Sequence, residues 1–201
     1  MNTAQMEKFT THCDRYFEQT DAMVLHPTVQ ETIHIDVLRY KPNEKYPFWK
    51  LVTMGASDYK MPNAKGQLGD RNEYIMAVDA EVDLDDPQVY SWYFHTLLAI
   101  AKAPIDGRYF MSYGHYVDWP ADADTDMVGA YLTMPQVIED VGVLRCKLGL
   151  MKQAICLQVV LLTREEMDKL LEIGPEAFDD YLYPEDGPCH FLCERNRSQK
   201  F

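Results

Sequence analysis

Ser57 and Asp58 stand side by side in the stretch FWKLVTMGASDYKM, residues 48–61, where a strand-like segment runs into a polar turn. A serine on a sharp turn after a strand can act as the nucleophile of a hydrolase, but that turn needs a small residue two positions later, where this chain has Tyr59. A catalytic triad would also need a histidine from elsewhere in the chain. Serine and aspartate side chains often satisfy the backbone of their own turn instead. We therefore expect Gly55, Ser57 and Asp58 to form a structural turn, and a small hydrolase is the alternative.

Two other groups of residues could bind a metal ion. His34 and Asp36 alternate along a predicted strand and lie on one face of it, which allows a metal site or an acid–base pair. The alternative is a histidine that is only hydrogen-bonded within the sheet, which is the more common case. Cys189, His190 and Cys193 could bind zinc, but structural zinc sites normally take four ligands from two pairs. We expect no metal and no cofactor, and a metal-dependent enzyme remains part of the alternative.

The composition limits the classes of partner. The net charge is −13, from 32 acidic and 19 basic residues, which argues against nucleic acids and anionic membranes but not against a basic protein. The five cysteines are odd in number and irregularly spaced, so a disulfide framework is not expected. The N-terminal residues do not have the pattern of a secretory signal, and no apolar run reaches membrane-spanning length. A reducing cytoplasm is the expected location.

The periodicity of apolar residues predicts one domain of the α+β class, with a mixed β-sheet and helices packed against it. The Asp86–Pro87 pair should start the middle helix and Pro104 should end it. Thr163 and Glu166 predict a capping box for a helix whose inward side is Met167, Leu170 and Leu171. The predicted helices are 3–19, 86–104, 163–174 and a short helix or turn at 175–183; the predicted strands are 33–38, 48–54, 73–78, 108–119 with a break at Gly114, 127–134 and 154–162. The strand 33–38 should be half-buried, Cys156 should be a buried apolar residue, and the tail from residue 184 should be polar and irregular.

Several stretches, in this order, resemble the suppressor of fused (SUFU) domain family. They are IHID at 33–36, FWKLVTMGASDYKM at 48–61, NEYIMAV at 72–78, the Trp92 helix to LLAIAKAP, YGHYVDW at 113–119, YLTMPQ at 131–136 and VVLLTREEMDKL at 159–170. The segment LVT-x-G-x-SD is the most specific of them. Ala56 departs from the family pattern, since many members have methionine there. The resemblance divides the chain into an N-terminal helix and lead-in at 1–29, a SUFU-like domain at 30–173, and a helix or turn with a tail at 174–201 within the same domain.

This resemblance implies a mode of action. Eukaryotic members of the family are two-domain cytoplasmic regulators that hold Gli-type transcription factors, bind a short partner segment in extended form and have no known catalytic function. The chain matches only their first domain, and residues 174–201 are too few for the second, so it looks like a stand-alone bacterial-type member. Such members have been proposed as immunity proteins against polymorphic toxins. We expect a non-catalytic module that binds a protein or peptide, either as an immunity protein that binds a toxin domain or as a scaffold or regulator.

The resemblance also places the partner surface near GHYVDW and the acidic loop after it. The candidate contact residues are Tyr113, His115, Trp119 and Asp122, with Asp124 as the competitor for the position of Asp122. Aromatic side chains beside carboxylates suit a basic or mixed peptide. The alternative is that Trp119 belongs to the core and the aspartates are only solvated. The sequence gives no indication of the oligomeric state.

Overall fold

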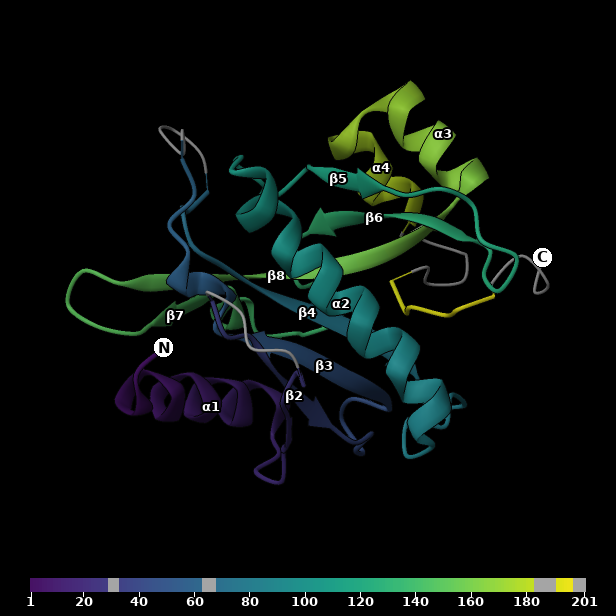
Figure 1. The fold of residues 1–201 in the computed structure, drawn as a ribbon. Helices are drawn as coiled ribbons and strands as arrows, with labels where there is room; N and C mark the ends of the chain where they lie inside the picture. The colour runs from purple at the N-terminus through teal and green to yellow at the C-terminus, as the bar shows by residue number, and fades with distance from the viewer. Residues whose placement is uncertain (29–32, 63–67, 183–190, 197–201) are drawn as a thin grey trace.

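A mixed sheet of eight strands forms the middle layer of the molecule (Figure 1). The computed structural model describes residues 1–28, 33–62, 68–182 and 191–196. The strand order is β1-β2-β3-β4-β8-β6-β5, and β7 pairs with the first part of β8. The strands are β1 Met23–Leu25, β2 Asp36–Tyr40, β3 Phe48–Met54, β4 Asn72–Asp79, β5 Tyr116–Asp118, β6 Met127–Thr133, β7 Arg145–Lys147 and β8 Gln153–Thr163.

The strand β8 lies at the centre of this sheet. It runs parallel to β4 and antiparallel to β6 and β7, and all of its residues from Ala154 to Leu162 are buried. Its almost unbroken apolar sequence is typical of a strand that is covered on both faces. Cys156 is fully buried in it, as predicted.

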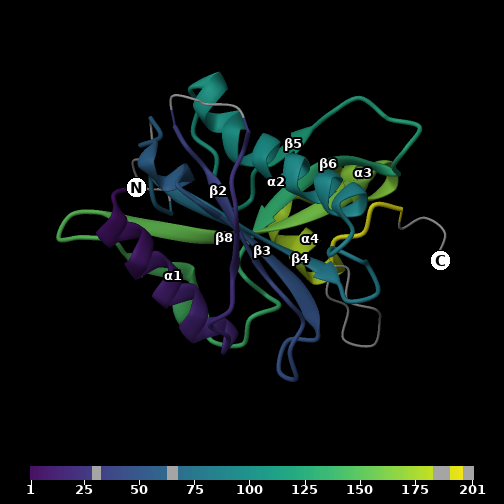
Figure 2. The same cartoon turned by 60° about the horizontal axis from the view of Figure 1, so that its bottom comes forward.

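Helices cover both faces of the sheet (Figures 1 and 2). Along β4, Tyr74 and Met76 pack in the cluster that contains α2, while Ile75 and Ala77 point to the other face and pack in the cluster that contains α1. A third cluster joins α3 and α4 to β6 and β8. The helices are α1 Thr3–Phe17, α2 Pro87–Gly107, α3 Arg164–Ile173 and α4 Pro175–Leu182. The predicted α+β domain with a mixed sheet and packed helices is confirmed. In the part of the chain that the structure describes, no helix combines the length and the apolarity that crossing a membrane requires.

Several predictions about strands and helices need correction. The strand predicted at 108–119 is limited to β5, which has three residues. The strand predicted at 33–38 begins at Asp36, and it is buried on both faces rather than one, because α1 covers the face that was expected to be exposed. The middle helix starts at Pro87 as predicted but passes through Pro104 to Gly107. Pro104 is buried against the core, and its carbonyl accepts a hydrogen bond from the amide of Arg108 at the end of the helix. The packing of its ring therefore compensates for the backbone hydrogen bond that a proline cannot donate.

Two segments near the C-terminal end also differ from the prediction. The capping box of Thr163 and Glu166 is present, but Leu171 is 59% exposed, because the helix turns it away from Met167 and Leu170, which face the sheet. The tail is not polar throughout. Phe191 and Cys193 are fully buried, and the Cys193 amide donates to the carbonyl of Ala77 in β4 at 2.7 Å. Cys189 and His190 lie outside the described residues, so the structure does not describe the predicted zinc ligands as a set.

The burial of Phe191 predicts that the C-terminal segment stabilises the whole domain. Phe191→Ala should lower the free energy of unfolding by about 3–5 kcal/mol, the usual cost of removing a fully buried phenylalanine. Leu171→Ala is the control, because it removes an exposed side chain and should change stability by less than about 0.5 kcal/mol. Urea unfolding followed by circular dichroism measures both values. Equal stability of the two variants would contradict a structural role for the segment.

Candidate functional site

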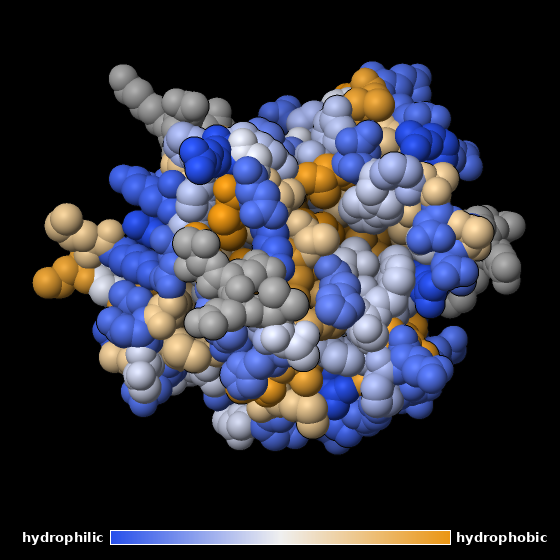
Figure 3. Space-filling view, in the orientation of Figure 1, coloured by the Kyte–Doolittle hydropathy of each residue, from blue (hydrophilic) through white to orange (hydrophobic). Residues whose placement is uncertain are grey.

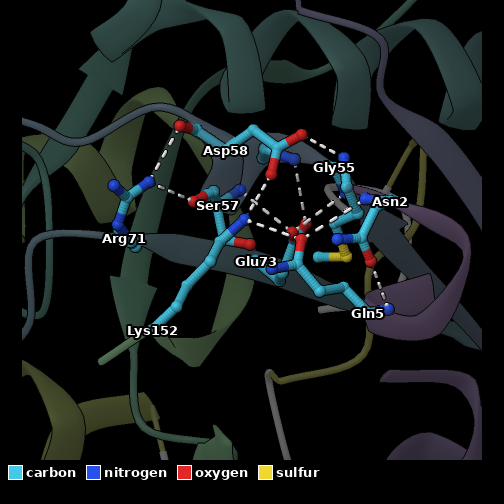
Figure 4. A network of polar contacts seen from close by, with 10 residues as sticks. Asn2, Gln5, Gly55, Ser57, Asp58, Arg71, Glu73 and Lys152 are labelled. Carbon is cyan, nitrogen blue, oxygen red and sulfur yellow. Dashed lines mark hydrogen bonds and ion pairs between the residues drawn. The ribbon is translucent and has the colours of Figure 1, made fainter. Parts of the chain in front are cut away.

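A buried carboxylate holds the turn that follows β3 (Figure 4). Glu73 in β4 is fully buried, and its Oε1 accepts the amides of Gly55 and Ser57, each at 2.9 Å. Its Oε2 accepts the hydroxyl of Thr53 at 2.7 Å and the amide of Ala56 at 3.2 Å. Both oxygens therefore serve two donors each. Burial raises the pKa of Glu73, and the hydrogen bonds from Ser57, Thr53 and Gly55 oppose that rise.

Gly55 is required at this turn for two reasons. Its φ is +128°, which side-chain-bearing residues rarely adopt, and a Cβ atom built on it would lie 2.2 Å from the carbonyl oxygen of His34. The residue that follows β3 therefore also touches the backbone that leads into β2. The next residues form the short 3₁₀ helix Ala56–Asp58.

Ser57 and Asp58 have different surroundings within this turn. Ser57 is fully buried. Nη1 of Arg71 donates hydrogen bonds to the backbone carbonyls of Ser57 and Asp58, at 2.9 and 2.8 Å. The Asp58 carboxylate pairs with Lys152 and with the amino group of Met1. Burial raises the pKa of Asp58, but the hydrogen bonds from these two cations outweigh that effect and leave it below its ordinary value. Because these groups hold the turn together and Ser57 is inaccessible, we infer a structural role for the turn.

The proposed contact residues Tyr113 and His115 lie just before β5 and bond to neighbouring segments. The Tyr113 hydroxyl donates to Oδ2 of Asp179 in α4 at 2.9 Å, and burial raises the pKa of Tyr113 to about 12. Nδ1 of His115 lies 3.2 Å from the carbonyl oxygen of Ser112. Both side chains are half-buried, so only part of each faces solvent.

Trp119, Asp122 and Asp124 lie at the other end of β5. Trp119 is half-buried, and its Nε1 donates to the carbonyl of Met127 at 2.9 Å. Asp122 and Asp124 are exposed in the following loop, and Asp122 Oδ1 accepts the amide of Asp124 at 3.1 Å. The carbonyl of Asp124 accepts Nε of Arg195 at 2.9 Å. The five predicted residues thus flank one short strand from both ends and do not form a single cluster.

A groove of about 720 Å³ runs between α2 and β5. Figure 3 shows apolar atoms at the floor of the hollow between these elements. Small side chains of one face of α2 keep it open, and aromatic side chains from both walls line it. The lining residues are Gln88, Ser91, Trp92, His95, Thr96, Ala99, Ile100, Ala103, Val117, Asp118, Trp119 and Arg195.

Most of this lining was not among the residues singled out from the sequence. Trp92 was predicted only as part of the middle helix and His95 was given no role, although their spacing with Ala99 places all three on one helix face. Arg195 comes from the C-terminal segment, and its guanidinium carbon lies 5.5 Å from the centre of the Trp92 ring. Its amide donates to the hydroxyl of Tyr93 at 3.0 Å. No local sequence pattern places Arg195 beside α2.

The strand β5 is the last in the sheet order, so one of its edges has no neighbouring strand among the residues that the structure describes. Trp119 donates its amide to Val128 of β6, and the carbonyl of His115 accepts the amide of Leu132. Alternate residues of a strand direct their backbone groups to opposite sides. The amides of Tyr116 and Asp118 therefore face away from β6. This free edge runs beside the groove, which gives a polypeptide a place for backbone pairing and a place for side chains.

His34 and Asp36 are close to each other, as their spacing predicted. Nε2 of His34 lies 2.6 Å from Oδ1 of Asp36, and a residue not considered from the sequence, His26, places its Nδ1 2.7 Å from the same oxygen. This cluster lies at the start of β2, and none of its three residues lines the groove.

The chain is similar to one protein family and to several solved structures. A family model described as "Suppressor of fused protein (SUFU)" matches residues 31–196. The crystal structure of a SUFU homologue from Neisseria gonorrhoeae FA 1090 aligns with a TM-score of 0.69 at 13% identity, covering 96% of this chain and 95% of that one. A Sufu–Fu complex aligns with a TM-score of 0.66 at 13% identity, covering 98% and 91% of the two chains.

A third solved structure is longer than this chain. Drosophila Suppressor of Fused aligns with a TM-score of 0.69 at 12% identity over 98% of this chain, which spans 51% of the Drosophila chain. These identities are low, so the solved structures support the fold alone. No curated protein is similar enough to the chain to count as a match.

The hydrogen bonds of Glu73 predict that an amide cannot replace its carboxylate. In Glu73→Gln, the better orientation turns the NH₂ group toward Thr53 and Ala56, because the Thr53 hydroxyl can rotate and accept from it, but the amide of Ala56 then loses its acceptor. An unsatisfied buried group costs about 1–3 kcal/mol, so the free energy of unfolding should fall by about that amount. Asp58→Asn is the control, because its partly exposed ion pairs are worth about 0–1 kcal/mol. Urea unfolding that ranks Asp58→Asn as the more destabilising variant would contradict this account.

Proposed function

We propose that this chain, which belongs to the suppressor of fused family, is a non-catalytic module that binds a partner polypeptide in extended form. The family fold is found in a Sufu–Fu complex, a structure in which that protein is bound to a partner. The observation that carries the proposal is the groove between α2 and the free edge of β5. An extended segment there adds a strand beside β5 and directs alternate side chains into the groove.

The lining of the groove supports a particular kind of segment. Trp92 and Trp119 offer large aromatic surfaces of the kind that dominates binding energy in protein interfaces. Asp118 lies on the rim, and Asp122 and Asp124 are exposed nearby. Carboxylates at a rim favour basic partners and speed their association. We therefore propose a segment with apolar or aromatic side chains for the groove and a lysine or arginine for the rim.

The surface predicted from the sequence overlaps with this groove at Trp119. We propose that Tyr113 and His115 stabilise the start of β5 and do not contact the partner. The hydroxyl of Tyr113 donates to Asp179, and His115 contacts its own turn. Asp122 and Asp124 act through their charge. A nucleic acid is not the proposed partner, since the net charge is −13. A cytoplasmic location belongs to the proposal, because Cys13, Cys146 and Cys156 are buried thiols outside any disulfide in the part of the chain that the structure describes.

Two classes of partner fit such a module. One is a toxin domain, which the chain would neutralise as an immunity protein, and the other is a protein that the chain holds as a scaffold or regulator. Capture from native lysate by the chain and by a groove variant, followed by mass spectrometry, separates them. A partner with toxic activity that the chain suppresses identifies immunity. The hydrolase alternative has less support, because Ser57 is fully buried.

Backbone pairing along β5 predicts the effect of removing one amide. Tyr116→Pro deletes an outward-facing donor, and an edge strand tolerates proline. Peptides selected from a random displayed library on the unaltered protein should bind this variant roughly tenfold more weakly, the equivalent of about 1.4 kcal/mol. Tyr116→Thr is the matched control, because it also removes the aromatic ring but keeps the amide.

Calorimetric titration of one selected peptide against both variants measures the difference, with circular dichroism as the test of folding. If Tyr116→Pro and Tyr116→Thr bind the peptide equally well, pairing along β5 is ruled out. Loss in both variants would mean that the Tyr116 side chain, rather than the backbone, carries the contact.

The groove itself predicts that Trp92 is an anchor. Trp92→Ala should weaken binding of the same peptide by about 2 kcal/mol or more, as expected of a buried aromatic anchor. Tyr181→Ala removes an aromatic ring of α4, which packs on the other face of the sheet, and should leave the affinity unchanged. Fluorescence titration measures both affinities. A peptide that binds Trp92→Ala as tightly as the unaltered protein must bind elsewhere on the molecule.

A further inference from the structure

We propose that His26, His34 and Asp36 form a binding site for a divalent transition metal ion, with Zn²⁺ as the probe that tests it. The three side chains come from the segment after β1 and from the start of β2. One ligand atom of each lies within 4.8 Å of the others. This site is separate from the groove, and the inference does not depend on the proposed function.

The donor set selects the class of ion. Two imidazole nitrogens and one carboxylate oxygen suit Zn²⁺ and its first-row neighbours, whereas Mg²⁺ and Ca²⁺ prefer oxygen ligands alone. Sites of two histidines and one carboxylate leave at least one position open for water or another ligand. Here that position faces solvent, because the side chains of His26 and His34 are 63% and 54% exposed.

The two distances to Asp36 need only a small change for an ion to enter. Nδ1 of His26 and Nε2 of His34 lie 2.7 and 2.6 Å from the same Asp36 oxygen. Ligand atoms around a tetrahedral zinc ion with bonds of about 2.0–2.1 Å are roughly 3.3–3.5 Å apart. Each nitrogen must therefore move away from the carboxylate by less than about 1 Å. The imidazoles can move because they are exposed, while Asp36 is 2% exposed and stays fixed.

The surroundings of Asp36 favour a cation at this position. A buried carboxylate needs a partner of opposite charge or several donors. Among the residues that the structure describes, its ion-pair partners are the two histidines, and both approach Oδ1. Their rings lie nearly parallel, at 27° with centroids 6.1 Å apart, and one nitrogen of each approaches the same oxygen. A single dication between them would satisfy all three groups together.

The site also has a structural consequence. The carbonyl oxygen of His34 lies against Gly55, and Asp36 is paired in register with Met54, the last residue of β3. A bound ion would therefore fix the entry to β2 against the turn that Glu73 holds. It would stabilise the folded state, because the unfolded chain does not hold the three ligands together.

The experiment uses the full chain without a histidine tag, after treatment with a chelator and removal of the chelator. Calorimetric titration with ZnCl₂ should show stoichiometric binding, and Zn²⁺ should raise the melting temperature. His26→Ala and His34→Ala should each weaken binding by about tenfold or more, since even the outer partners of metal ligands contribute that much. His95→Ala is the matched control, because His95 is an exposed histidine of the groove, outside the cluster. MgCl₂ should not bind.

Three results would overturn the proposal. The first is the absence of Zn²⁺ binding to the unaltered protein, and the second is equal affinity in the unaltered protein and in His26→Ala and His34→Ala. The third is an equal loss in His95→Ala, which would indicate adventitious binding to surface histidines. The two cluster variants change exposed side chains, so they should fold, and circular dichroism verifies this.

Discussion

The four hydrogen bonds that the buried side chain of Glu73 accepts are the interaction on which the alignment of the central strands depends. An ionised or neutral carboxyl group buried in a sheet is costly unless its oxygens are bonded, and here four donors from β3 and the turn bond to it. The group therefore locks the end of β3 onto the start of β4. Arg71, two residues earlier, binds the same turn from outside, and its carbonyl accepts the amide of Ile155 in β8. Three neighbouring strands are thereby held in register around one turn.

The strand β4 connects this turn to the groove. Its first residues pair with β8, and near its other end the amide of Cys193 bonds to Ala77. Cys193 brings Arg195 to Tyr93 and Trp92 of α2, while Arg195 also bonds to the loop after β5. One wall of the groove thus depends on the C-terminal segment, and the other on the pairing of β5 with β6. The lining of the groove thus comes from three distant parts of the sequence, on a frame that β4 holds.

This organisation explains what the sequence could predict. The capping box at Thr163, the start of α2 at Pro87 and the apolar run of β8 depend on adjacent residues, so local patterns predicted them. The strands β1 and β7 have three residues each and owe their conformation to β2 and β8, and no local pattern predicted them. The same reason separates the parts of the candidate site. The turn was recognised from its composition, but its partner Glu73 was not, because only pairing of β3 with β4 brings them together.

In the proposed binding mode, the free edge of β5 binds a partner without attracting further copies of the chain. Exposed edge strands promote association between sheets, and proteins limit this with short strands, charged residues and proline. β5 has three residues, carries the exposed Asp118 and is followed by Trp119 and Pro120. Two copies that met along this edge would bring Asp118 close to its own equivalent, and like charges repel. A basic segment meets the same carboxylate with attraction. In the proposed binding mode, the charge that disfavours self-association at the edge therefore also selects the partner, while Trp92 and Trp119 supply the apolar surface.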